Sequence, residues 1–580
     1  MMRILLLTHA FNSLTQRLAA DLQERGHEIS IEFDIADSVA EEAVALFRPD
    51  LIVAPYLRRA IPESIWKHTV CLIVHPGIVG DRGPSALDWA LQTAEPEWGV
   101  TVLQAEAEMD AGPVWATASV PLRAAKKSSV YRNEVTQAAA QAVLQAVGRF
   151  AAGGFVPTAL AAHSDARGQL RPLMRQSDRA IDWQRNDTAT VLQKINAADG
   201  FPGVADSLFG LACHIFDAWP EAVLRGSADA RPGALVARRE TAVLRRTIDG
   251  AVWIGHVKRP GSIKLPVTLA FAAESSALPE AKLDSWWRVG HATWQDIAYE
   301  ESGSDENAVG FLSFEFYNGA MSTMQCERLR SALAWAKRRP VRVLVLLGGA
   351  DFWSNGIHLN VIEAASLADG SPADESWNNI NAMNDLALEL IESGEQITIA
   401  ALAGNTGAGG CFLARAADLV WVRDGVLQNP HYKNMGNLYG SEYWTYLLPR
   451  RVGEEGAMNI MRNRQPLTAR RAVETGFSDA CLAGDPQVFR IDVARRAMEL
   501  AAATDLAERL AVKREIRMRD EASKPLAAYR QEELSHMRRN FYGFDPSYHV
   551  ARHHFVRKSL ASWTPRHLAR HRDLNWKIPA

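Results

Sequence analysis

Short apolar runs alternate with segments of helical periodicity over the first 150 residues. The apolar runs cover 4–7, 51–54 and 71–74, and helical spacing of apolar residues covers 16–25 and 85–93. This order is typical of an α/β open sheet that is largely parallel. Binding sites in such sheets lie beyond the carboxyl ends of the strands, so the loops after Leu7 and Val74 should line a cleft. Neither loop carries the GxGxxG turn of dinucleotide-binding proteins.

The pattern divides the chain into a first α/β part at 1–160, a β-rich part at 161–270, a linker at 271–305, a second α/β part at 306–515 and a helical tail at 516–580. The β-rich part holds one helix near 188–198 and short strands at 233–236, 242–246 and 251–256. The second α/β part starts with a strand at 309–314, a helix at 323–337, and strands at 341–347 and 398–403. The last 70 residues hold 15 Lys and Arg against 7 Asp and Glu, so the tail is basic.

Charge and cysteine content narrow the kind of partner. The chain of 580 residues carries 64 Lys and Arg against 67 Asp and Glu, a net charge of -3, which lacks the basic excess of a nucleic-acid-binding protein and would not draw it to anionic membranes. No stretch approaches 18 apolar residues, and the N-terminal apolar run is too short for a signal sequence. The five cysteines form no CxxC pair, which indicates a reducing cytoplasm and no structural metal. We therefore expect a cytoplasmic protein that acts on small molecules.

The first constellation with catalytic potential lies in CLIVHPGIVGDRGPSALDWAL and GVTVLQAEAEMDAGPV. A strand ends at His75, because Pro76 and Gly77 follow it, and Asp110 lies on a turn closed by Gly112. A histidine and an aspartate from two loops of one cleft can form a base and its orienting carboxylate. Taken alone, the pair is equally consistent with a loop histidine and an ordinary structural aspartate.

These residues resemble the 10-formyltetrahydrofolate-dependent formyltransferases, whose core reads Asn-x-His-Pro, Arg-Gly, Gly-Val-Thr and Asp-x-Gly. The chain supplies His75-Pro76, Arg82-Gly83, Gly99-Val100-Thr101 and Asp110-Ala111-Gly112 in that order. The segments IDWQRND, INAADGFPGV and PGALVARRETAVLRRTIDGAVWIGHV are similar to the C-terminal β domain of methionyl-tRNA formyltransferases. The resemblance implies 10-formyltetrahydrofolate as formyl donor, His75 and Asp110 as catalytic residues, and Ile73 and Leu103 in cofactor binding.

Ile73 departs from the formyltransferase pattern, because the family has its catalytic Asn two residues before the His. That Asn supports the developing oxyanion, a contact typically worth about 3 to 4 kcal/mol. Either formyl transfer is lost here or the acceptor differs. A thiol acceptor would depend less on this oxyanion contact, because a thiol of pKa near 8.5 is partly ionised at neutral pH and is a strong nucleophile.

The second constellation comprises GGADFWSNGIHLNVIE at 348–363 and ALAGNTGAGGCFLARAADLVW at 401–421. Each predicted strand ends in a glycine turn that opens a helix, so unpaired backbone N–H groups could converge and form an oxyanion hole. The alternative is that the glycines serve only the tight turns. Together the two segments resemble the crotonase (enoyl-CoA hydratase/isomerase) superfamily over about 305–515, which implies that the N–H groups of Ile357 and Gly409 form the hole.

The crotonase-like part also departs from its family. Phe412 and His431 stand where hydratases of this family place the two glutamates that handle water, so we expect no addition of water to a double bond. Tyr432 and Glu442 are the titratable candidates that remain nearby. They can work as an acid and base pair only if the pocket moves their pKa values toward neutrality.

The combination of both parts, with NSLTQR, SSVYRNEVT, DFWSNGIHLN and FYNGAMS, resembles the HypX/HoxX-type hydrogenase maturation proteins over essentially the whole chain. The expected fold is α/β multidomain: an open sheet, a small β-rich domain and a crotonase-like ββα spiral with a helical tail. The resemblance implies that formyl-CoA is made and decarbonylated to CO and CoA, with CO becoming a ligand of the nickel-iron site. Hydrogenase maturation proteins are then the expected partners.

Coenzyme A carries phosphates, which suit arginine side chains. The candidate contacts are Arg17, Arg132 and Arg557, with Asn318 and the turn at Gly200 and Phe201. Each arginine is also consistent with an ordinary surface position. The tail histidines at 549, 553 and 554 have helical spacing, but we expect no metal there. Three other functions stay open: a formyltransferase for an amino sugar or aminoacyl-tRNA, a formyl-CoA hydrolase, and a CoA-binding assembly scaffold.

Overall fold

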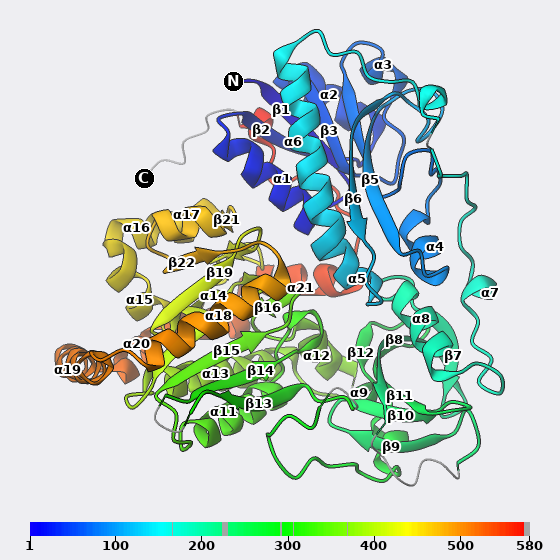
Figure 1. The fold of residues 1–580 in the computed structure, drawn as a ribbon. Helices are drawn as coiled ribbons and strands as arrows, with labels where there is room; N and C mark the ends of the chain where they lie inside the picture. Colours follow the sequence, from blue (N-terminus) through cyan, green and yellow to red (C-terminus); the bar gives the residue numbers. More distant parts are fainter. Residues whose placement is uncertain (165, 223–229, 291–292, 305–306, 368, 574–580) are drawn as a thin grey trace.

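The computed structural model describes residues 1–164, 166–222, 230–290, 293–304, 307–367 and 369–573. It shows three domains, each with its own sheet, and a helical C-terminal segment (Figure 1). This arrangement confirms the predicted α/β multidomain fold. No helix in the described residues is long and apolar enough to cross a membrane.

The first domain is a six-stranded sheet of order β2-β1-β3-β4-β5-β6, parallel from β2 to β4 and antiparallel at β5 and β6. The apolar runs of the sequence become its buried central strands, and helices cover both faces. Its strands are β1 (Arg3–Thr8), β2 (Glu28–Phe33), β3 (Leu51–Tyr56), β4 (Cys71–His75), β5 (Glu97–Gln104) and β6 (Val114–Pro121). Its helices are α1 (Ser13–Glu24), α2 (Asp37–Phe47), α3 (Glu63–Trp66), α4 (Ala86–Gln92), α5 (Lys127–Val130), the π-helical turn η1 (Tyr131–Val135) and α6 (Thr136–Ala152).

The second domain is an antiparallel sheet of order β7-β8-β11-β10-β9, with β12 beside β11 and α8 packed across it. The predicted helix at 188–198 is α8, and the strand predicted at 242–246 is β10. The elements are α7 (Gln176–Arg179), α8 (Thr188–Ala198), β7 (Val204–Leu208), β8 (Leu211–Glu221), β9 (Leu235–Arg239), β10 (Ala242–Arg246), β11 (Ala251–Lys258), β12 (Lys264–Pro266), α9 (Val267–Ala270) and α10 (Ala272–Ser276).

The segment 271–305, predicted as a linker, contains a strand of the third domain. This strand, β13 (Ile297–Ser302), pairs antiparallel with β14 along its whole length. Tyr299 on β13 is fully buried, and its ring lies 5.2 Å from that of Trp287 and 5.0 Å from that of Trp335. Aromatic burial therefore attaches the second half of this segment to the third domain.

The third domain contains a repeated unit in which a long strand is followed by a short strand. In the first two units a helix follows the short strand. The long strands form one sheet of order β13-β14-β15-β17-β19-β22, and the short strands form a second sheet of order β16-β18-β20-β21. Its strands are β14 (Val309–Phe314), β15 (Val343–Gly348), β16 (Phe352–Ser354), β17 (Ile397–Leu402), β18 (Asn405–Gly407), β19 (Leu419–Arg423), β20 (Leu427–Asn429), β21 (Leu467–Thr468) and β22 (Ala480–Leu482). Its helices are α11 (Thr323–Ala336), α12 (Leu359–Ala364), α13 (Pro372–Ile391), α14 (Gly409–Arg415), α15 (Trp444–Leu447), α16 (Pro449–Asn463), α17 (Ala469–Glu474) and α18 (Pro486–Ala501).

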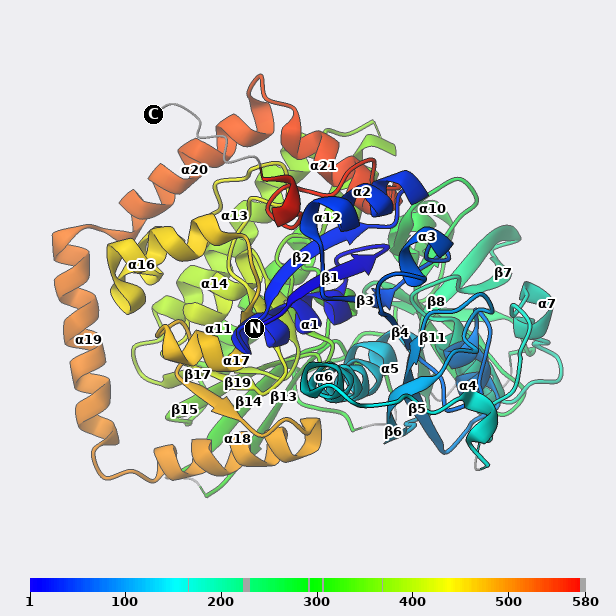
Figure 2. The same cartoon turned by 90° about the horizontal axis from the view of Figure 1, so that it is seen from above.

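Three helices follow the third domain and run around its outside (Figure 2). They are α19 (Leu506–Ser523), α20 (Leu526–Tyr542) and α21 (Ser547–Arg557), so the predicted helical tail from residue 516 begins inside α19. The buried residues of α20 include Leu526, Met537 and Phe541, which pack on the third domain. The tail is therefore an integral layer of that domain.

The chain then returns to the first domain and pairs with the edge strand β2. The backbone N–H of Ile31 donates to the carbonyl of Leu568 at 3.1 Å, and that of Phe33 donates to Thr564 Oγ1 at 2.8 Å. Glu32 is fully buried between these contacts, with His571 Nε2 at 2.9 Å and Arg572 Nε at 2.7 Å. This clasp ties the two ends of the sequence together.

We predict that Glu32→Gln lowers the free energy of unfolding by about 3 kcal/mol, because it leaves buried partners without their counter-charge. Burial alone would raise the pKa of Glu32, but hydrogen bonds from His571, Thr564 and Arg572 lower it below its ordinary value. A carboxyl with a lowered pKa contributes stability above the pKa of the unfolded chain and loses it as pH falls. Urea denaturation at pH 7 should thus give a lower free energy of unfolding for Glu32→Gln than for the wild type, and this difference should shrink as the pH falls. Glu28→Gln, on the exposed end of the same strand, is the control; equal effects of both changes would refute the clasp.

Candidate functional site

His75 ends strand β4 and is held between two carboxylates. Its Nε2 lies 3.1 Å from Asp81 Oδ1, and its Nδ1 lies 3.6 Å from Asp110 Oδ2. Asp110 has a φ of 56°, a conformation that costs roughly 1 to 3 kcal/mol in a non-glycine residue and recurs at functional positions. The structure therefore brings the two predicted residues to one point and adds a third.

Asp81 is a carboxylate beside His75 that the sequence pattern did not single out. Its side chain is fully buried, and an added Cβ at Gly77 would lie 2.8 Å from Asp81 Oδ1 and 2.4 Å from His75 Nε2. A glycine at 77 is thus required for the close approach of the two side chains. Asp81 directly precedes the Arg82-Gly83 motif, and that position was the signal available in the sequence.

Ile73 and Leu103 form a direct cross-strand pair between β4 and β5. Ile73 is two residues before His75, so its side chain lies on the same face of the strand. It packs against the apolar cluster that includes Leu5, Leu7 and Ala54. An apolar side chain thus occupies the position where formyltransferases have a polar oxyanion donor.

The two glycine turns of the third domain meet where β16 and β18 end. An added Cβ at Gly356 would lie 3.2 Å from the backbone nitrogen of Gly409, so the turns are in contact. Within the described residues, the N–H groups of Ile357 and Gly409 donate to no protein acceptor. Two free donors on adjoining turns can receive one oxyanion.

A buried carboxyl lies directly against Gly409, the residue that carries one of these donors. Glu442 is fully buried, and an added Cβ at Gly409 would lie 2.5 Å from its Oε1. Tyr432 Oη donates to Glu442 Oε2 at 2.5 Å and also lies 3.0 Å from the carbonyl of Ser441. Glu442 Oε1 has no hydrogen-bond partner among the described residues. The structure thus brings Tyr432, Glu442 and Gly409 together with one carboxyl oxygen free.

Burial sets the protonation of this cluster. Burial raises the pKa of Glu442 to about 8, with the charge of Glu533 adding to the rise and the hydrogen bond from Tyr432 opposing it. Burial and the charge of Glu442 raise the pKa of Tyr432 well above its ordinary value, so the phenol stays a donor. A carboxyl with a pKa near neutrality can both accept and return a proton.

The two positions that would hold hydratase carboxylates are filled by other groups. Phe412 is fully buried and stacks on Tyr432, with ring centroids 5.6 Å apart. His431 is buried, both of its ring nitrogens lack partners among the described residues, and burial lowers its pKa to about 4. Neither side chain can serve as an anionic base for water at neutral pH.

The predicted CoA contacts fall into separate groups. Arg132 Nη2 donates to Asn318 Oδ1 at 3.2 Å, so the structure brings these two together. Lys264 Nζ donates to the carbonyl of Gly200 at 3.0 Å and lies 3.1 Å from the hydroxyl of Tyr317, next to Asn318. The Gly200 and Phe201 turn is therefore joined to Asn318 through a lysine that the sequence did not single out.

All three arginines have carboxylate partners, and Arg132 Nη1 lies 3.5 Å from Asp351 Oδ2. Arg17 pairs with Asp21 at 2.7 Å, and Arg557 pairs with Glu363, which also binds Arg552 at 2.8 Å. His553 Nδ1 lies 3.1 Å from the same Glu363. Within the described residues, no group of three His, Cys, Asp or Glu side chains is placed to hold a metal ion.

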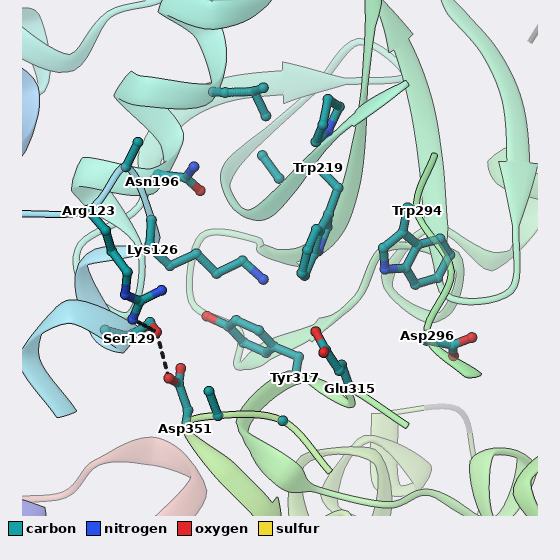
Figure 3. Close-up of a pocket in the computed structure, with 18 of the residues that line it drawn as sticks. Arg123, Lys126, Ser129, Asn196, Trp219, Trp294, Asp296, Glu315, Tyr317 and Asp351 are labelled. Carbon is teal, nitrogen blue, oxygen red and sulfur yellow. Dashed lines mark hydrogen bonds between the residues drawn. The ribbon is translucent and has the colours of Figure 1, made fainter. Parts of the chain in front are cut away.

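A cavity of about 1320 Å³ lies at the junction of the three domains (Figure 3). In the described part of the chain its lining includes Asn318 but not His75 or Glu442. Lys126 projects between Trp219 and Tyr317, with Nζ 4.0 Å from the Trp219 ring and 2.5 Å from Asp217. Lys126 is thus already paired with a carboxylate.

Comparison with known proteins gives the class of the chain. The formyl transferase family model matches residues 29–147, the model of the formyl transferase C-terminal domain matches 173–273, and the enoyl-CoA hydratase/isomerase model matches 315–564. A methionyl-tRNA formyltransferase of Ralstonia nicotianae is 25% identical over 233 residues, which cover 40% of this chain and 69% of the relative. The chain is therefore a formyltransferase unit joined to an enoyl-CoA hydratase-like unit.

Two relatives match the whole fusion. The hydrogenase maturation factor HoxX of Bradyrhizobium diazoefficiens is 52% identical over 573 residues, 98% of this chain and 97% of the relative. The crystal structure of HypX from Aquifex aeolicus in complex with tetrahydrofolic acid covers 100% of both chains at 45% identity, with a TM-score of 0.93. The chain belongs to the HypX/HoxX family of hydrogenase maturation factors, which confirms the resemblance predicted from the sequence.

We predict that Asp81→Asn slows formyl transfer from 10-formyltetrahydrofolate about 100-fold with the fold retained, because the His75 ring loses one of its two carboxylates. Formation of tetrahydrofolate in a single turnover measures the effect. Glu108→Gln is the control, since this exposed residue pairs with Arg82 in the same region. A wild-type rate in Asp81→Asn would show that Asp110 alone orients the ring.

Proposed function

We propose that this chain transfers a formyl group from 10-formyltetrahydrofolate to the thiol of coenzyme A and then breaks formyl-CoA into CO and CoA. The CO would become a ligand of the nickel-iron site during hydrogenase maturation, with maturation proteins as partners. Five free thiols suit a reducing cytoplasm. The observation that carries the proposal is the buried Glu442 carboxyl beside the free N–H groups of Ile357 and Gly409.

The first step belongs to His75. The CoA thiol attacks the formyl carbon, His75 takes the thiol proton, and the carbon–nitrogen bond to the folate breaks as that nitrogen receives the proton. Asp81 and Asp110 hold the imidazole during this exchange. A thiol needs less help than an amine, which accounts for Ile73 at the position of the oxyanion donor.

The second step belongs to the Glu442 cluster. The N–H groups of Ile357 and Gly409 bind the thioester oxygen, ionised Glu442 takes the formyl hydrogen, and the carbon–sulfur bond breaks as CO leaves. The proton then passes to the CoA thiolate, so formyl-CoA yields CO and free thiol in balance. The pKa of Glu442, about 8, lies near that of a thiol, and this match favours return of the proton.

Exclusion of water decides between this reaction and hydrolysis to formate. Phe412 offers no base for water and closes one side of Tyr432, and burial makes the imidazole of His431 a weak base by lowering its pKa to about 4. Tyr432 holds Glu442 Oε2, which leaves Oε1 for the substrate. We infer that the pocket favours loss of CO because no activated water reaches the carbonyl.

The phosphates of CoA are assigned to the group around Arg132, Asn318 and the Gly200 and Phe201 turn. Lys264 joins this group, since it has no carboxylate within ion-pair distance in the described part of the chain and burial lowers its pKa to about 8. Arg132 lies 3.5 Å from Asp351, whereas Arg17 and Arg557 would have to leave closer carboxylate partners. Arg557 can bind a CoA phosphate only after its ion pair with Glu363 is broken.

We predict that Tyr432→Phe and Glu442→Gln accumulate formyl-CoA from 10-formyltetrahydrofolate and CoA, whereas His75→Ala forms none. The reason is that the first two changes disable only the second step. Chromatography of the thioesters and haem trapping of CO measure both outcomes. Tyr439→Phe, on the same segment but stacked on His536, is the matched control and should make CO as the wild type does. If the first two variants and His75→Ala behave alike, the assignment of steps to domains is wrong.

A further inference from the structure

Glu442 and Tyr443 are consecutive non-glycine residues in the left-handed region. Both have a φ of 60°, and Tyr443 precedes the short helix α15. A side chain in this conformation crowds the backbone, so it persists only where neighbouring groups hold it. The carboxyl that we assign to the second step is thus carried by a strained turn.

Side chains from two distant helices hold that turn. Glu533 on α20 is fully buried and accepts from the backbone N–H groups of Tyr443 and Thr445, both at 2.9 Å, and from Thr445 Oγ1 at 2.6 Å. Asn384 on α13 accepts from the N–H of Glu442 and from Ser441 Oγ, both at 2.8 Å. The N–H groups of both strained residues therefore end on side chains from outside the segment.

We propose that Glu533 is a positioning residue, which holds residues 442 and 443 in their left-handed conformation and so keeps the Glu442 carboxyl against Gly409. If the two carboxylate oxygens of Glu533 are removed, the N–H groups of Tyr443 and Thr445 and the hydroxyl of Thr445 lose their acceptor. The strained turn can then relax. Relaxation would move Glu442 Oε1 away from Gly409, against which it now lies. Helix α20 of the tail thereby positions the Glu442 carboxyl through buried Glu533. The reaction that this carboxyl performs rests on the proposed function.

Glu533 also acts on Glu442 through its charge. The titratable groups that face Glu442 are Tyr432 from the segment after β20, Cys326 from α11 and Glu533 from α20. Burial raises the pKa of Glu533 to about 7, and its hydrogen bonds from Thr445 and Tyr443 oppose the rise. The other groups that face Glu533 are Tyr432, Tyr439 and Tyr443, while Arg530 is engaged with Asp385 at 2.6 Å. Removal of the Glu533 charge should therefore lower the pKa of Glu442.

The test is an infrared titration of the Glu442 carboxyl in the full chain, with Glu442→Gln as the spectrum that identifies the band. The wild type should titrate near pH 8, and Glu533→Gln should titrate lower by roughly half a unit or more. Glu532→Gln is the matched control, because this neighbour on α20 is exposed and pairs with Lys524. An unchanged midpoint in Glu533→Gln would overturn the proposal.

Turnover of supplied formyl-CoA gives the second readout. Glu533→Gln should lower kcat roughly tenfold or more with little change in KM, and Glu533→Asp should recover part of it, since misplacement of a reacting group affects the chemical step. Equal losses in Glu533→Gln and Glu532→Gln would contradict a positioning role. If the wild type titrates as expected but leaves formyl-CoA intact, the proposed function fails and the positioning role stands.

Thr445→Val covers the case in which Glu533→Gln does not fold. Loss of the hydroxyl donor raises the pKa of Glu533, so Glu533 carries less charge at a given pH and repels ionised Glu442 less. The Glu442 midpoint should then fall in the same direction by a smaller amount. A rise, or no change, would overturn the proposal.

Discussion

Burial of the Glu442 carboxyl against Gly409 is the constraint on which the catalytic part of the fold depends. A carboxyl without solvent resists ionisation, and its pKa of about 8 reflects that cost. Glycine at 409 makes the approach possible, because a Cβ would lie 2.5 Å from Oε1. Tyr432, Asn384 and Glu533 then hold the carboxyl and the backbone that carries it. The third domain thus fixes one buried titratable carboxyl against a glycine whose backbone N–H is free in the described residues.

Hydrogen bonds join the third domain to the first. Ser129 Oγ and Asn133 Nδ2 of the first domain donate to Asp351 Oδ1 of the third at 2.6 and 3.0 Å. Asn429 Nδ2 donates to Gln16 Oε1 at 3.2 Å, which joins the end of β20 to helix α1. The clasp at Glu32 adds a third connection through the C-terminal segment. The His75 cluster and the Glu442 cluster are therefore fixed on one scaffold.

Local features of the sequence predicted much of the fold and some of the residues that the structure brings together at each candidate site. The strand ending at His75 and the helix at 188–198 were predictable because apolar runs there are bounded by proline, glycine or a capping aspartate. The strand β13 was missed, because Ala, Ser and Glu around it suggest a linker while its burial depends on tryptophans from other segments. Asp81 could be found in the sequence only as the residue before the Arg82-Gly83 motif.

The groups that tune the second site could not be read from local sequence. Asn384 and Glu533 lie 58 and 90 residues from the backbone groups they bind, so no periodicity links them to Glu442. The left-handed conformation of Glu442 and Tyr443 gives no compositional signal, since neither residue is glycine or asparagine. The partner of Arg557 is equally remote, because Glu363 lies 194 residues away. Such long-range contacts follow from packing, which a single sequence does not display.

The most direct test of the account is to supply carbon-13-labelled formyl-CoA to the protein without folate and to analyse every labelled product. We predict labelled CO, trapped by haem and identified by its infrared absorption, in an amount equal to that of the free CoA formed. Labelled formate without labelled CO would contradict it, because water would then reach a carbonyl that the Glu442 pocket should keep dry.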